Sequence, residues 1–216
     1  MNIKDYIEKY KIICICRKLY GEDLMKLAHA LYDGGIRMIE VTYDQNDPEC
    51  TSKTVDAIAD LCGEFGDEMR FGAGTVLNKD QVDAAKSAGA EYIISPNTNV
   101  EVIKYTKACG LVSIPGAMTP SDILTAHDSG ADFVKLFPAT WLGFPYIKDI
   151  LGPITHVKLI ATGGVKEENL QQYIDMGFAG AGISGRLTNK KLIENGNFAE
   201  ITKRSSNFMS IINNIK

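Results

Sequence analysis

Paired cysteines, long apolar runs and a strong excess of one charge are all missing from this 216-residue sequence. Its five cysteines are an odd number, and no two have the Cys-x-x-Cys spacing, so neither a disulfide framework nor a zinc ribbon is predicted. The amino-terminal segment 2–9 is too charged for a signal peptide, and the next apolar run, 12–16, is too short to cross a membrane. These absences predict a cytoplasmic protein.

The composition excludes several further classes of protein. Apolar residues make up 45% of the chain and charged residues 23%, which are values of a globular rather than a disordered protein. With 23 basic and 27 acidic side chains, a broad binding surface for nucleic acid or an anionic membrane is not expected. The three histidines, His29, His127 and His156, form no i, i+4 pair, so they predict no metal site.

Short β-branched runs alternate with stretches whose apolar residues have helical spacing, such as Leu24, Leu27, Ala28 and Leu31. Eight of the runs are predicted to be strands: 12–17, 38–43, 70–75, 92–96, 112–116, 133–138, 157–164 and 179–185. Each strand–helix unit then has about 27 residues, and such alternation is typical of a parallel sheet. We therefore expect an α/β protein that forms a single (β/α)8 TIM barrel, one domain spanning residues 1–216.

An open, doubly wound sheet also alternates strands with helices and is the competing fold. Two absences favour the barrel. No Gly-x-Gly-x-x-Gly motif follows the first run, and no linker rich in Pro, Gly and Ser divides the chain.

Several helix boundaries are marked in the sequence. Thr119 followed by Pro120, and Asn78 with Gln81 three residues later, are typical helix starts. The amphipathic segment 198–215 is expected to be the eighth helix of the barrel. The single tryptophan, Trp141, is expected to pack against a helix rather than to cover the site.

Two charged residues lie inside runs that should be buried on both faces. Lys135 is the more informative, because a buried ammonium is unfavourable unless it is paired or neutral. A lowered pKa would leave a neutral amine that can attack a carbonyl and form a Schiff base. Glu40 is suited to act as a general acid/base. A structural ion pair between Lys135 and Glu40 would explain the same placement without catalysis.

Six short motifs follow one another along most of the chain: Ile39-Glu40-Val41-Thr42, Gly72-Ala73-Gly74-Thr75-Val76, Ser95-Pro96, Pro115-Gly116 with Thr119-Pro120, Val134-Lys135-Leu136-Phe137-Pro138 and Thr162-Gly163-Gly164-Val165. In this order they resemble the 2-keto-3-deoxy-6-phosphogluconate (KDPG) and 4-hydroxy-2-oxoglutarate (KHG) aldolase family. The resemblance extends from about residue 12 to the last helix.

The resemblance implies roles for individual residues. It aligns Lys135 with the Schiff-base lysine of the family and Glu40 with its acid/base carboxylate. The residues that would bind the substrate are Arg17, Thr75, Pro96, Phe137 and Thr162. Those that would bind a phosphate group are Gly163, Gly164, Ser184 and Gly185. Independently of the resemblance, backbone N–H groups of glycine-rich turns bind anions, and barrels often bind phosphate after strands seven and eight.

The sequence departs from the family pattern where substrate choice is made. Asp44 supplies an acid close to the place where some members carry an arginine, and Asn97 and Ala161 replace a common Gly and Pro. Ser184-Gly185 reverses the usual Gly-Ser order, and Arg186 follows at once, either as a phosphate clamp or as a surface residue. These changes leave open whether the substrate is phosphorylated.

By resemblance, the chain is expected to be a class I lyase that cleaves a KDPG-type or KHG-type 2-keto acid to pyruvate and an aldehyde, D-glyceraldehyde 3-phosphate or glyoxylate. The resemblance implies a homotrimer that needs no cofactor and no metal. Two alternatives remain open. A phosphosugar isomerase or epimerase would use Glu40 to abstract a proton and Lys135 to polarise a carbonyl. A non-catalytic barrel would bind a phosphorylated keto acid without turnover.

Overall fold

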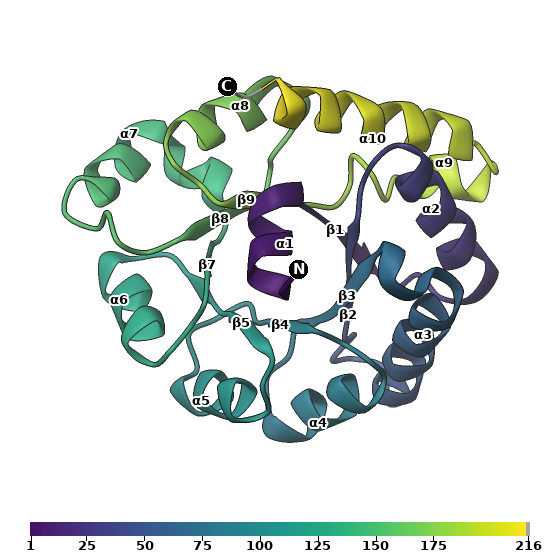
Figure 1. Ribbon diagram of the computed structural model, residues 1–216, viewed down its shortest axis with the longest axis horizontal. Helices are drawn as coiled ribbons and strands as arrows, with labels where there is room; N and C mark the ends of the chain where they lie inside the picture. Colours follow the sequence, from purple (N-terminus) through teal and green to yellow (C-terminus); the bar gives the residue numbers. More distant parts are fainter. Residues whose placement is uncertain (215–216) are drawn as a thin grey trace.

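The parallel strands form a ring, and helices surround it (Figure 1). The computed structural model describes residues 1–214. The strands are β1 (Ile12–Arg17), β2 (Met38–Thr42), β3 (Arg70–Gly74), β4 (Tyr92–Ile94), β5 (Val112–Ile114), β6 (Gly116–Ala117), β7 (Val134–Leu136), β8 (Leu159–Thr162) and β9 (Gly180–Ile183). They are hydrogen-bonded in the order β5-β4-β3-β2-β1-β9-β8-β7-β6.

The ring contains nine strand segments because the fifth predicted strand is divided at Pro115. A proline has no N–H group to donate to a neighbouring strand, so it interrupts the ladder. The part before Pro115, β5, pairs with β4, and the part after it, β6, pairs with β7. The N–H of Lys135 also donates to the Pro115 carbonyl at 2.8 Å. The ring therefore closes through Pro115, and the predicted (β/α)8 TIM barrel is confirmed.

The helices are α1 (Ile3–Tyr10), α2 (Gly21–Asp33), α3 (Cys50–Phe65), α4 (Lys79–Ser87), α5 (Val100–Ala108), α6 (Pro120–Asp128), α7 (Ala139–Leu151), α8 (Glu167–Asp175), α9 (Lys190–Glu194) and α10 (Phe198–Asn213), with a 3-10 turn, η1 (Gly66–Glu68). Both predicted helix starts are confirmed, since Asn78 and Thr119 each accept the N–H three residues later. The last helix ends at Asn213, and Ile215, predicted to belong to it, lies outside the described residues. Helices α1 and α9 were not predicted.

Alternation along the strands divides the buried side chains into two cores. Ile12, Cys14 and Cys16 of β1 face outward and pack under the surrounding helices. Ile13 of the same strand faces into the barrel. The other apolar residues of this inner core are Tyr6, Ile7, Met38, Tyr92, Ile94, Val112, Ile114, Phe133 and Ile160.

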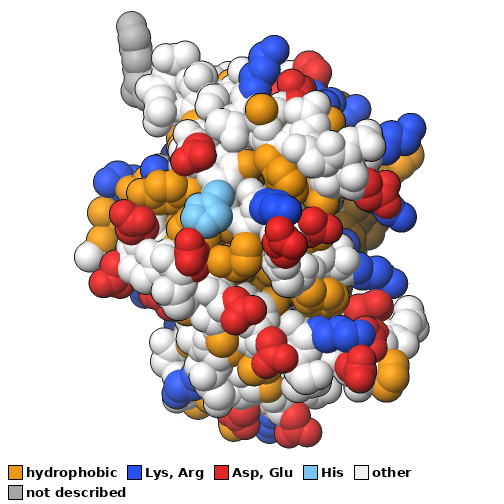
Figure 2. All heavy atoms as spheres, turned by 90° about the vertical axis from the view of Figure 1, so that its right-hand side faces the viewer, with side chains coloured by type: hydrophobic (Ala, Val, Ile, Leu, Met, Phe, Trp, Pro, Cys, Tyr) orange, Lys and Arg blue, Asp and Glu red, His pale blue; other side chains and the backbone are white. Residues whose placement is uncertain are grey.

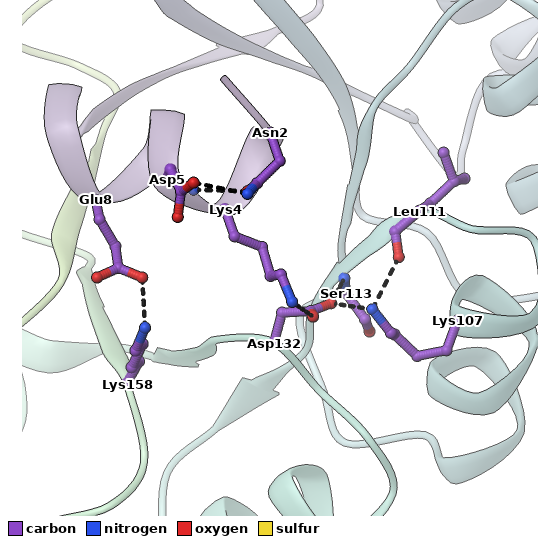
Figure 3. Close-up of polar contacts among 9 residues, drawn as sticks. All are labelled: Asn2, Lys4, Asp5, Glu8, Lys107, Leu111, Ser113, Asp132 and Lys158. Carbon is purple, nitrogen blue, oxygen red and sulfur yellow. Dashed lines mark hydrogen bonds and ion pairs between the residues drawn. The ribbon is translucent and has the colours of Figure 1, made fainter.

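Helix α1 closes the amino-terminal end of the barrel. It directly precedes β1 and lies across the middle of the ring in Figure 1. Its buried residues, Tyr6 and Ile7, belong to the inner core. Its polar face is tied to the rim, where Glu8 pairs with Lys158 and Lys4 lies 3.6 Å from Asp132 (Figure 3). The inner core is therefore sealed at this end, and only the carboxyl end of the strands is left for a site.

On the side of the molecule that Figure 2 presents, acidic, basic and apolar side chains are interspersed, and no large patch of one charge is seen. This mixture agrees with the small net charge of the sequence. Among residues 1–214, no helix is long and apolar enough to span a membrane.

Shortening the side chain of Ile7, in the helix α1 that closes the barrel, is expected to destabilise the protein. Ile7 is fully buried in the inner core, so Ile7→Ala leaves a cavity and should lower the free energy of unfolding by about 2–4 kcal/mol, measured by urea titration. Lys9→Ala on the exposed face of α1 is the control and should change stability by less than about 0.5 kcal/mol. Equal effects of the two substitutions would show that α1 does not seal the core.

Candidate active site

Lys135 lies in the interior of the barrel, near the carboxyl end of β7. Its side chain is inward because its strand neighbours, Val134 and Leu136, belong to the outer core. Lys135 is only 3% exposed, and its Nζ lies 5.1 Å from the centre of the Phe137 ring. Gly116 and Ile160 are its partners on the two adjacent strands. The lysine is therefore enclosed by aromatic and apolar groups rather than by solvent.

Glu40 lies inside the barrel on β2 and is 1% exposed. A Cβ atom at Gly74, on the adjacent β3, would collide with the Glu40 carboxylate. The missing side chain at Gly74 is thus what makes room for the acid. Glu40 Oε1 has no hydrogen-bond partner among the described residues. A buried carboxylate oxygen without a partner is unfavourable in a purely structural role and suits a group that exchanges a proton.

Burial shifts the proton affinities of these two groups in opposite directions. It lowers the pKa of Lys135, an effect that Glu40 opposes and Arg17 reinforces. Burial also raises the pKa of Glu40, with Lys135 and Arg17 opposing it. Both shifts favour the uncharged forms, an amine with a free lone pair and a protonated carboxyl. The arrangement can supply a nucleophile and a general acid/base from two buried side chains that influence each other electrostatically.

A pocket of about 300 Å³ opens at the carboxyl ends of β1, β8 and β9. Seven residues predicted from the sequence line it: Arg17, Phe137, Thr162, Gly163, Gly164, Ser184 and Gly185. The pocket is lined by three cationic side chains, Arg17, Lys166 and Arg186, and by no acidic one among the described residues. This lining is suited to an anionic ligand.

Two glycines shape this pocket because no side chain fits there. Gly163 and Gly164 have φ angles of 94° and 78°, which L-residues with side chains rarely adopt. A Cβ atom on Gly164 would lie 2.5 Å from the Thr140 hydroxyl, and one on Gly163 would lie 3.2 Å from Pro138. This loop, which precedes the N-cap of α8 at Lys166, therefore presents its backbone to the pocket.

Thr75 and Pro96, also predicted to bind substrate, are not among the residues that line this pocket. Thr75 directly follows β3 and has a φ of 58°, a strained value for a β-branched residue. Its carbonyl accepts a hydrogen bond from Gln45 Nε2 at 2.8 Å. The Pro96 carbonyl lies so close to Gly116 that a Cβ there would clash. Since Gly116 pairs with Lys135, Pro96 lies on the Lys135 side of the barrel mouth.

Ion pairs engage the two charged residues that depart from the family pattern. Asp44 binds Lys18 at 2.9 Å, which lowers the pKa of that carboxyl, and it does not line the pocket. Arg186 lines the pocket and is paired with Glu167.

Two residues next to the pocket, Glu167 and Asn169, were not predicted from the sequence. The side-chain amide of Asn169 donates to the Gly164 carbonyl at 3.1 Å. The capping position of Asn169, three residues after Lys166, was the available signal.

The prediction that Trp141 packs against a helix is wrong, because this side chain is 88% exposed on α7. Near it in the chain, Gly143 has a non-helical backbone with a φ of 75°, and Pro145 follows. The helix that carries Trp141 is therefore interrupted two residues after it.

In residues 1–214, no three His, Cys, Asp or Glu side chains lie close enough to form a metal site. Two of the three histidines, His127 and His156, pack edge-to-face with their ring centroids 5.0 Å apart, and His29 Nε2 lies 2.9 Å from Glu64 Oε1.

The family model for KDPG and KHG aldolase matches residues 3–204. The chain belongs to this family. It is 35% identical over 180 residues to the 2-dehydro-3-deoxy-6-phosphogalactonate aldolase of Escherichia coli (83% of this chain, 85% of that one). It is 32% identical to the 2-dehydro-3-deoxy-phosphogluconate aldolase of Treponema pallidum over 98% of both chains.

A solved structure of a family member is also similar to this aldolase. The KDPG aldolase of Legionella pneumophila, with pyruvate captured as a covalent carbinolamine intermediate, superimposes with a TM-score of 0.84 at 29% identity. The match covers 95% of this chain and 97% of that one. As a member of the family, the chain is an aldolase, that is, a carbon–carbon lyase.

Replacing one member of the buried pair at a time should give opposite pH dependences of stability. In Lys135→Met, Glu40 loses a cation that lowers its pKa, so the pKa of Glu40 in the folded protein rises further above its value in the unfolded chain. The free energy of unfolding is then highest below the unfolded-state pKa of Glu40 and falls as the pH rises through its folded-state pKa. In Glu40→Gln, Lys135 loses the group that raises its pKa, so stability is lost as the pH falls toward the folded pKa. Urea unfolding at about pH 6 and about pH 9 measures both slopes.

The double variant Glu40→Gln/Lys135→Met is the reference for this comparison. It has neither buried titrating group, so its stability should change less between about pH 6 and about pH 9 than that of either single variant. Slopes of the same sign in the two single variants would contradict the opposite pKa shifts.

Proposed function

We propose that this aldolase works through a Schiff base on Lys135 and cleaves a phosphorylated 2-keto-3-deoxy sugar acid, of the KDPG type, to pyruvate and an aldehyde such as D-glyceraldehyde 3-phosphate. The observation that carries the proposal is the enclosed amine of Lys135, with Glu40 in the same interior and a cationic pocket at the barrel mouth. The carbinolamine in the related Legionella pneumophila enzyme supports the same chemistry here.

The first stage is imine formation. The neutral Nζ of Lys135 attacks the C2 carbonyl of the substrate and forms a carbinolamine. The protonated Glu40 carboxyl gives its proton to the departing hydroxyl, water leaves, and an iminium remains. Glu40 is now a carboxylate next to a cation, which favours its ionised form.

The second stage breaks the carbon–carbon bond. Glu40 takes the proton of the C4 hydroxyl, the C3–C4 electron pair moves into the iminium, and the aldehyde leaves an enamine behind. Glu40 gives this proton to C3, and hydrolysis of the resulting iminium by water releases pyruvate, restores the Lys135 amine and returns a proton to Glu40. Phe137 and Pro96 would bound the pyruvate part, and Thr75 and Thr162 would face the substrate with their hydroxyl groups.

The pocket supports a phosphorylated substrate over 4-hydroxy-2-oxoglutarate, which would give glyoxylate. Gly163, Gly164, Ser184 and Gly185 lie together in the pocket with Arg17 and would bind the phosphate group. Backbone N–H groups at the start of α8 are suited to a dianion. The acid at Asp44, which could have repelled a phosphate, is neutralised by Lys18 instead.

Borohydride reduction in the presence of pyruvate tests the proposal. We expect one reduced pyruvate adduct on Lys135, found by intact mass and peptide mapping. Lys135→Ala should give no adduct and lower kcat at least about 10³-fold, because the nucleophile is gone. Glu40→Gln should lower kcat about 10²- to 10⁴-fold and still form some adduct, since the amine is retained.

Absence of an adduct from folded wild-type protein would refute the Schiff base. It would favour the isomerase or the non-catalytic barrel, in which Lys135 makes no covalent bond. Loss of the adduct in Glu40→Gln would move Glu40 from acid/base chemistry to maintenance of the neutral lysine. Circular dichroism of each variant establishes that it is folded.

We also propose that the chain, residues 1–216, is one domain that assembles as a homotrimer in the cytoplasm. An exposed Trp141 supports an interface, because large aromatic side chains are enriched at subunit contacts. Met118 is 47% exposed, and its carbonyl accepts a hydrogen bond from Tyr146 of α7, the helix that carries Trp141. These apolar side chains lie at the same end of the barrel.

Replacing Trp141 with a charged residue should dissociate the trimer. Size-exclusion chromatography with light scattering should give three times the 23.6-kDa chain mass for the wild-type protein and one chain mass for Trp141→Glu. Trp141→Phe keeps an apolar ring and is the matched control, which should remain trimeric. A wild-type protein of one chain mass would refute the trimer.

A further inference from the structure

The loop after β9 carries a cation that the roles above do not use. Arg186 follows Ser184 and Gly185, and it lines the pocket. One edge of its guanidinium is held by α8, where Nε donates to Glu167 Oε2 at 2.9 Å and Nη2 donates to Oε1 at 3.0 Å. Such a two-bond pairing fixes the plane of the guanidinium as well as its position.

The backbone at Arg186 is also fixed. The N–H groups of Leu187 and Thr188 both donate to the Ser184 carbonyl, at 2.7 and 2.9 Å. From α10, Arg204 Nη1 donates to the Arg186 carbonyl at 3.2 Å. The loop and the side chain of Arg186 are therefore ordered before any ligand binds, so that little further entropy is lost on binding.

The pairing leaves one nitrogen of the guanidinium available. Because the group is planar, a carboxylate on the Nε–Nη2 edge leaves Nη1 on the opposite side, and Nη1 makes no hydrogen bond to residues 1–214. Glu167 itself is mostly buried and is not part of the pocket lining. The pocket thus contains the cationic side of this ion pair and not its acidic side.

We propose that Arg186 binds the anionic group of the substrate and raises the preference for phosphorylated substrates, and that Glu167 is the residue that positions it. The inference rests on the proposed function and extends it to residues outside the family motifs. Nη1 would add a charge-assisted hydrogen bond to those given by the backbone of Gly163 and Gly164. An unphosphorylated substrate does not reach this cation and gains nothing from it.

Steady-state kinetics with phosphorylated and unphosphorylated 2-keto-3-deoxygluconate test the role of Arg186. Arg186→Ala should raise KM for the phosphorylated substrate about tenfold, with kcat little changed and KM for the unphosphorylated one unaffected. Competitive inhibition by inorganic phosphate should weaken by the same factor. Arg186→Lys keeps the charge without the two-bond pairing and should fall between Arg186→Ala and the wild-type protein.

Glu167→Gln tests the positioning role, since it leaves Arg186 in place with a weaker partner. KM for the phosphorylated substrate should rise about threefold. Glu91→Gln is the matched control: it weakens another Arg–Glu pair, with Arg70 at 3.2 Å, at the amino-terminal end of the barrel. Its KM values should equal those of the wild-type protein.

Two results would overturn the inference. A wild-type KM and wild-type phosphate inhibition in Arg186→Ala would show that Arg186 does not contact the anion. A fall in KM in Glu167→Gln, or a value equal to that of Glu91→Gln, would show that Glu167 does not position Arg186. Either result can occur while pyruvate is still trapped on Lys135 in the wild-type protein, whereas failure of the proposed function appears as loss of that adduct.

Discussion

The limited space inside a ring of parallel strands is the constraint on which the rest of this structure depends. Every second residue of a strand points inward, so each large interior group needs a small neighbour. Gly72 leaves room for the ring of Tyr92, and Gly74 leaves room for the carboxylate of Glu40. The glycines of β3 thus allow a buried acid in an interior that is otherwise mostly apolar.

The same constraint produces layers along the barrel axis. Helix α1 and the inner apolar core fill the amino-terminal end, so water reaches the interior from the carboxyl end. Lys135 and Glu40 are buried below the cationic pocket and do not line it, but Phe137, whose ring lies 5.1 Å from Lys135 Nζ, does. Their environment disfavours charge on both, while the pocket above favours an anion. A molecule with a keto group at one end and an anionic group at the other would match this change from an apolar interior to a cationic pocket.

Much of this arrangement could be predicted, because it depends on local patterns. Alternation of β-branched runs with amphipathic stretches predicts a parallel α/β fold, and the missing Gly-x-Gly-x-x-Gly motif and linker favour the barrel over an open sheet. A charged residue inside a buried run marks Lys135 and Glu40. The pairing of Arg186 with Glu167 could not be predicted, because the residues are 19 positions apart on different elements. The exposure of Trp141, 88%, was mispredicted because tertiary packing decides which side of a helix is covered.

The sequence by itself determined the alternation of strands and helices, the placement of Lys135 inside a buried strand and the glycine loops, because short-range periodicity and turn chemistry dictate them. Only the tertiary structure decided which cations share a pocket, which acids neutralise them and which end of the barrel is closed. Ring closure brings β1, β8 and β9 side by side, so Arg17 meets loops that follow it by more than 140 residues. Contacts of that range follow from the geometry of the closed sheet and leave no pattern in neighbouring residues.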